Sequence, residues 1–111
     1  MFKKASEFEG HELMAGISLE LLCHGDKTLM GRFLLKKGHE LPMHSHLYEQ
    51  TGYMASGHMV LTIDGIEHDV TKGDSWCILE NIPHGAKVIE DSIVIEIFSP
   101  PREDYKIIGR K

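Results

Sequence analysis

Two histidines stand one residue apart in the segment PMHSHLYEQ, residues 42–50. Alternate side chains of an extended chain point to the same side, so His44 and His46 face the same way. Gln50 can return to that face if the residues between them bulge or turn. In a distant segment, NIPHG, Pro83 stiffens the loop that presents His84. Neutral imidazole is the commonest side-chain ligand for metals, so these residues predict a metal site.

The histidine pair alone leaves two interpretations open. The chain has eight histidines, and any single one is more often a surface or core residue than a ligand. Two exposed histidines on a strand edge would give the same HxH pattern. No partner in the sequence distinguishes the other five, which are His11, His24, His39, His58 and His68.

Short apolar runs between turn signals must position these residues, and they predict an all-β fold. Turn signals occur at residues 24–27, 36–39, 55–57, 64–65, 72–74 and 90–92. We expect strands near ISLELL, TLMGRFLL, EQTGYMA, SWCILE, GAKVI and SIVIEIF. The clearest hairpin is MVLTIDGIEHDV, in which Asp64-Gly65 suits a tight primed turn. The longest helix-like segment is the polar start SEFEGHELM.

Composition fits one soluble domain. A chain of 111 residues buries roughly two-thirds of the surface that its unfolded form exposes. A net charge of −5 without a basic run disfavours nucleic acid as a partner. Membrane insertion needs roughly 20 consecutive apolar residues, and the sequence has no such stretch. The start MFKKASEFEG lacks the apolar centre of a signal peptide, so we expect a cytoplasmic protein.

The two cysteines are far apart and not in metal-binding spacing. In a reducing compartment we expect free thiols, with Cys77 buried beside Trp76 and Cys23 in a turn. A disulfide between them stays open at this point.

The glycines around the histidines resemble the first motif of the cupin superfamily, G-x5-H-x-H-x3,4-E-x6-G. Gly38, His44, His46 and Gly57 match it, and Gln50 stands where the family usually has glutamate.

The segment GDSWCILENIPHGAKV resembles the second cupin motif, G-x5-P-x-G-x2-H-x3-N. Gly73 and His84 match in register. Leu79, Asn81 and Val88 replace the proline, the glycine and the final asparagine. Asparagine tolerates the left-handed conformation better than most residues, so Asn81 is a mild departure.

This resemblance covers about residues 28–98. It implies a single-domain cupin jelly roll, a small antiparallel β-barrel. Residues 1–27 would form an N-terminal segment with the first strand, and residues 99–111 a C-terminal tail on the domain or on a partner. Small single-barrel cupins are usually dimers, so a homodimer is implied. The implied metal ligands, inside the barrel mouth, are His44, His46, Gln50 and His84.

Such a ligand set carries no formal charge, so a bound divalent ion would keep its full positive charge and act as a strong Lewis acid. Imidazole-rich sites accept Zn, Ni, Mn, Fe, Co or Cu, and the sequence does not choose among them. Weak binding at a site without chemistry is the alternative.

A narrower resemblance, carried by HSHxxEQ and EIFSPPREDY, is to the cupins of pectin degradation. It implies metal-assisted ring opening of an unsaturated uronate, a sugar acid, to a linear keto acid. Glu96 would be the catalytic acid–base and Phe98 a substrate-binding residue. Alternatively, Glu96 points outward and its apolar neighbours inward. Arg32 could bind a substrate carboxylate or be a solvated surface charge.

Two other functions remain open within the superfamily. One is a metal-dependent dioxygenase, which needs a redox-active ion. The other is a binding module that holds a small sugar or acid without turnover.

Overall fold

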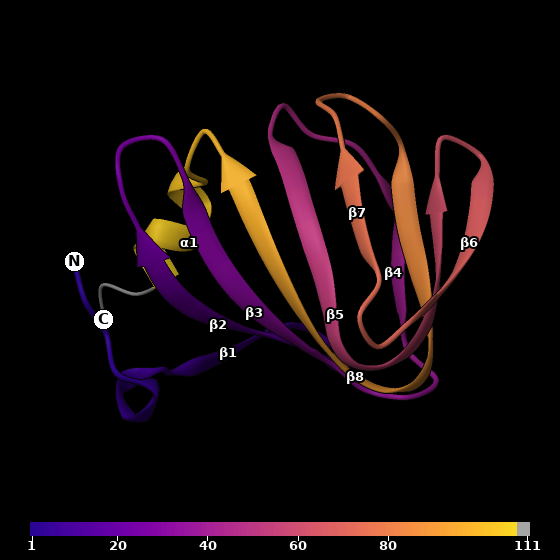
Figure 1. The fold of residues 1–111 in the computed structure, drawn as a ribbon, viewed down its shortest axis with the longest axis horizontal. Coiled ribbons are helices and arrows are strands. Elements are labelled where there is room, and N and C mark those ends of the chain that lie inside the picture. The colour runs from indigo at the N-terminus through magenta and orange to yellow at the C-terminus, as the bar shows by residue number, and fades with distance from the viewer. Residues whose placement is uncertain (109–111) are drawn as a thin grey trace.

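The computed structural model describes residues 1–108, the last two by backbone alone. It is built almost entirely from antiparallel strands (Figure 1). In chain order the elements are a 3₁₀ turn (Ala5–Glu7), β1 (Gly10–Met14), β2 (Ile17–His24), β3 (Leu29–Leu35), β4 (Glu40–His44), β5 (Glu49–Ile63), β6 (Ile66–Thr71), β7 (Ser75–Ile78), β8 (His84–Ser99) and α1 (Glu103–Ile108). The expected all-β class is confirmed.

The two longest strands, β5 and β8, pair along nearly their whole length and hold the fold together. In one half of the molecule β3 and β7 flank this pair, and in the other half β4 and β6 flank it. Figure 1 shows both long strands curving at the base of the molecule. Within residues 1–108 the hydrogen-bonded path runs from β1 to β6 without closing, as an open cupin jelly roll.

Gly57 makes the bend in β5 possible. Its φ of 107° is in the left-handed region, and a Cβ there would lie 2.2 Å from Ser92 Oγ on β8. The neighbouring His58 N–H donates to the same oxygen at 3.0 Å. The pairing of β5 with β8 shifts register around this point. Gly57, the second glycine of the first motif, therefore allows β5 to bend where it passes from one half of the molecule to the other.

The expected strands all form, but two pairs of them are continuous. EQTGYMA and MVLTI lie in β5, and GAKVI and SIVIEIF lie in β8. The hairpin from β5 to β6 is confirmed, because Asp64 and Gly65 have φ of 51° and 80°. Strands β1 and β4 were not expected.

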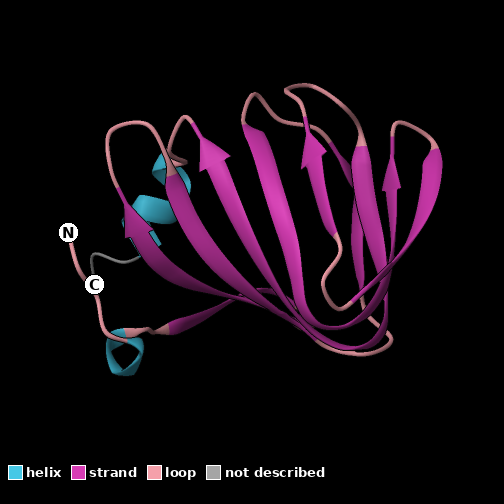
Figure 2. Cartoon of the chain, in the orientation of Figure 1, coloured by secondary structure: helices cyan, strands magenta, loops and turns pink. Residues whose placement is uncertain are grey.

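Helical structure in the described residues is confined to short segments near the two ends of the chain (Figure 2). Of the polar start, only the 3₁₀ turn at Ala5–Glu7 is helical, and β1 follows as an edge strand on β2. At the other end α1 packs Tyr105 onto the core, with its ring 6.1 Å from Phe33 and 5.5 Å from Phe98 between centroids. The segment after β8 thus covers the domain.

Cys77 is exposed, so its expected burial is wrong. It pairs with Thr51 across β7 and β5 on the outer face, whereas its neighbour Trp76 faces inward. Cys23 lies in β2, near its end and half-buried, so its expected place in a turn is also wrong; both cysteines are free. Neither described helix has the length and apolar character needed to cross a membrane.

Candidate metal centre and its cavity

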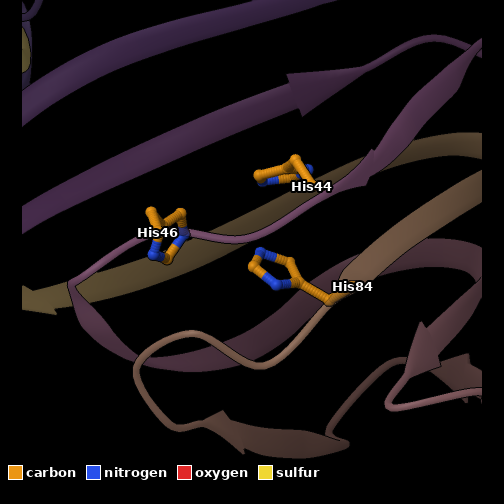
Figure 3. A group of neighbouring side chains, drawn as sticks. All are labelled: His44, His46 and His84. Carbon is orange, nitrogen blue, oxygen red and sulfur yellow. The ribbon is translucent and has the colours of Figure 1, made fainter.

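Three histidines from two distant segments meet in the structure (Figure 3). His44 ends β4, His46 follows it in a loop, and His84 begins β8. Their nearest ring nitrogens all lie within 4.8 Å of one another. The His84 ring centroid is 4.2 Å from that of His44 and 4.9 Å from that of His46. The predicted convergence of the two segments is confirmed.

Backbone contacts hold these segments together. His44 and His84 are cross-strand partners of β4 and β8. The N–H of Asn81 donates to the carbonyl oxygen of His46 at 2.7 Å. Asn81 adopts φ 64°, so asparagine takes the left-handed conformation at the position where the motif has glycine.

The three imidazoles are oriented in the same way. Each Nδ1 lies within hydrogen-bond distance of a backbone carbonyl two residues away, so Nδ1 carries the proton and Nε2 presents its lone pair. The bonds are His44 to Pro42 (2.8 Å), His46 to Tyr48 (3.0 Å) and His84 to Ile82 (2.9 Å).

Two of the Nε2 atoms have no hydrogen-bond partner. Among the described residues, His46 Nε2 and His84 Nε2 are buried and unpaired. An unsatisfied buried polar group costs about 1–3 kcal/mol. A metal ion would use both lone pairs, so the donor set fits a bound ion.

Burial lowers the pKa of both inner histidines. For His46 the next contribution is repulsion from Arg102, whereas the Gln50 amide and the Tyr48 carbonyl, which would accept hydrogen bonds from a charged ring, oppose the fall of the pKa. For His84 the hydrogen bond to Ile82 opposes it. Neutral imidazole, the form that binds metal, is therefore favoured.

Gln50 is buried on β5 and faces inward, as expected. Its Nε2 donates to Glu96 Oε2 at 3.1 Å. This bond fixes the amide orientation, because the carboxylate accepts and the NH₂ end must donate. The amide oxygen is left free to accept a hydrogen bond or to bind an ion.

Glu96 points into the molecule rather than outward, and is 8% exposed. Burial raises its pKa to about 7, against the effect of hydrogen bonds from Gln50 and Trp76. Ile95 and Ile97 are half-buried on the other face of β8. A carboxyl group with such a pKa can both accept and donate a proton near neutrality.

These groups share one cavity of about 300 Å³, with mostly apolar walls. Phe98 forms part of the wall, on the same face of β8 as Glu96. The polar side chains that line it are His44, His46, Gln50, His84, Glu96, Arg102 and Tyr105.

Arg102 is a cavity residue that the sequence did not indicate. Its guanidinium lies 3.9 Å from the ring centroid of Tyr105 and is held by Asp104 at 2.8 Å. It follows two prolines after β8, in the segment EIFSPPREDY of the narrower resemblance, which assigned roles to Glu96 and Phe98 but none to Arg102. Arg32, the arginine considered from the sequence, instead pairs with Glu20 at 2.7 Å, and neither residue lines the cavity.

Fold and site together define a cupin: residues 31–99 match the Cupin domain family model, and the chain belongs to this family. The pectin degradation protein KdgF of Dickeya dadantii (strain 3937) is 30% identical over 96 residues, covering 85% of this chain and 87% of that protein. The structure of KdgF from Halomonas sp. superposes with a TM-score of 0.90 and 26% identity, covering 95% and 97% of the two chains. H2HPP isomerase of Bacillus subtilis is 30% identical over 97 residues, 86% of this chain but 41% of that protein. The chain thus spans less than half of that isomerase.

Proposed function

We propose that this protein is a metal-dependent isomerase that opens the ring of an unsaturated uronate and releases a linear keto acid. The main support is that three clustered histidines, two of them with buried and unpaired Nε2 atoms, and a buried carboxyl group line the same cavity. Similarity to two KdgF proteins, one of them described as a pectin degradation protein, points to the same substrate class.

In the proposed reaction the hemiacetal carbon–oxygen bond of the ring breaks. Glu96 accepts the proton of the anomeric hydroxyl, whose oxygen becomes the aldehyde carbonyl. The electron pair of the broken bond stays on the former ring oxygen as an enolate. Return of one proton to the enolate carbon gives the ketone. Substrate and product therefore have the same composition, and no oxidant is needed.

His44, His46 and His84 would hold the ion, with Gln50 as the fourth ligand through its amide oxygen. A bound divalent ion supplies positive charge that stabilises the developing enolate. Such a donor set accepts Zn, Ni, Mn, Fe, Co or Cu.

Arg102 and Phe98 would bind the substrate. A guanidinium pairs with a carboxylate through two parallel hydrogen bonds, and a uronate carries one carboxylate. Phe98 offers an apolar wall for the face of the ring. The two residues lie close together, with the guanidinium 5.1 Å from the Phe98 ring centroid.

We also propose a homodimer through the outer face of β3, β8 and β5. Apolar side chains are cross-strand neighbours there, with Ile95 and Ile97 half-buried and Tyr53 47% exposed. A second copy could cover this patch by a two-fold contact. Light scattering of the wild type and of Ile95→Lys tests it, and a wild-type monomer would contradict it.

The free cysteines suit the proposed cytoplasmic location.

The enzymatic proposal is tested with the product of unsaturated oligouronide cleavage, followed by NMR. Each candidate metal is added separately to chelator-treated protein. We expect the wild type and His68→Ala, an exposed histidine on β6, to form the linear keto acid well above the spontaneous rate. His46→Ala should not. Equal rates for the wild type and His46→Ala would exclude the proposal.

The same assay distinguishes the two alternatives. Turnover without oxygen and with zinc alone would exclude the dioxygenase. Tight binding of a ligand that stays unchanged after long incubation would favour a binding module instead.

A further inference from the structure

Two glycines stand on either side of Glu96 in the sheet. In cross-strand register, Gly31 of β3 and Gly52 of β5 are its direct partners, and Trp76 of β7 is the partner of Gly52. Directly paired residues share a face, so Trp76 and Glu96 lie on the same inner face with only Gly52 between them.

The Trp76 indole occupies the space above Gly52. A Cβ built on Gly52 would lie 2.2 Å from both Cε2 and Nε1 of Trp76. Such a distance is far inside van der Waals contact, so any side chain at position 52 would displace the ring. Glycine in a strand often marks such a close approach.

Because Gly52 has no side chain, Trp76 can reach across it and contact Glu96. The indole N–H donates to Glu96 Oε1 at 3.3 Å, while Gln50 donates to Oε2 at 3.1 Å. The indole N–H has no acceptor capacity, so this contact requires an acceptor oxygen on the carboxyl group. Each carboxyl oxygen is thus held by a donor from a different strand.

We propose that Trp76 is a positioning residue that reaches Glu96 across Gly52 and fixes the orientation of its carboxyl group in the cavity. The catalytic consequence depends on the function proposed above, but the positioning itself does not. Without the indole, Glu96 would keep one donor and could rotate away from the direction in which it meets a substrate. A misplaced catalytic group lowers turnover more than binding.

The test uses Trp76 as its own probe, because it is the only tryptophan in the chain. Its indole N–H gives a single, self-assigned signal in a ¹H–¹⁵N NMR spectrum. We expect Glu96→Leu and Gly52→Ala to shift this signal and to speed its exchange with solvent. Gly25→Ala is the matched control, because a Cβ there meets nothing within 4 Å. An indole signal unchanged in Glu96→Leu would overturn the proposal without any assay of activity.

Trp76→Phe keeps an aromatic ring but removes the donor. We expect it to lower kcat by about 10-fold to 100-fold and to leave KM within a factor of about two. Full kcat in folded Trp76→Phe would also overturn the proposal. If the wild type shows no turnover, the proposed function fails, and the NMR result still decides the positioning role.

Discussion

Gln50 Nε2 donates to Glu96 Oε2 at 3.1 Å, between β5 and β8. This bond gives a physical reason for glutamine where the first cupin motif usually has glutamate. A glutamate at this position would put a second carboxylate against a buried one, and neighbouring like charges cannot both ionise cheaply. The amide instead donates to Glu96 and keeps its oxygen for the histidine side.

Gln50→Glu should therefore destabilise the metal-free protein, by about 1–3 kcal/mol at pH 8. The carboxyls will have raised pKa values in the folded state, so the loss grows as pH rises from the unfolded value through the folded one. Chemical denaturation at about pH 5 and pH 8 measures it. Thr28→Glu, at an exposed position in the loop between β2 and β3, should change stability by no more than about 0.5 kcal/mol. A pH-independent loss would contradict this explanation.

Loss of one histidine of the cluster should reduce metal binding by at least about 100-fold. The reason is that no other described histidine joins the group of three. Elemental analysis and metal titration of His84→Ala check it, with His68→Ala as control. Metal should also raise the melting temperature of the wild type but not that of His84→Ala. Unchanged metal content in His84→Ala would refute the site.

The affinity for metal should begin to fall at a lower pH than it would for imidazoles with the ordinary histidine pKa. Burial lowers the pKa of His46 and His84, so protons compete weakly with the ion until pH drops below the ordinary histidine value. Titrations at about pH 7.5, 6.5 and 5.5 should therefore show a smaller loss of affinity between the first two values than between the last two. A steep loss already between the two higher values would contradict the lowered pKa.

Arg102→Met should raise KM for a carboxylate substrate by about 10-fold to 100-fold, because a charge-assisted pair contributes about 1.5–3 kcal/mol. Steady-state kinetics provide the measurement. Arg32→Met, outside the cavity, is the matched control and should leave KM unchanged. If both variants bind substrate as the wild type does, Arg102 is not the carboxylate partner.

Alternation and turn chemistry predicted most strands, because these signals are local. They did not predict that β5 and β8 each continue through a bend. The bend at Gly57 depends on contacts with Ser92, which is distant in the sequence and lies on the partner strand. The two cupin motifs correctly predicted that His44, His46 and His84 lie close together. The sequence did not predict Arg102 as a cavity residue, because its position there depends on the tertiary packing of α1. It also did not predict which face of the sheet Cys77 occupies, because that depends on the register of Cys77 with Thr51.

Each imidazole of the cluster is anchored by a carbonyl only two residues along its own chain. The direction of each Nε2 lone pair is therefore set by a hydrogen bond within a segment of three residues, and not by packing against distant residues. Residues elsewhere on the cavity wall can then change with the compound to be accommodated, while the ion-binding corner stays the same.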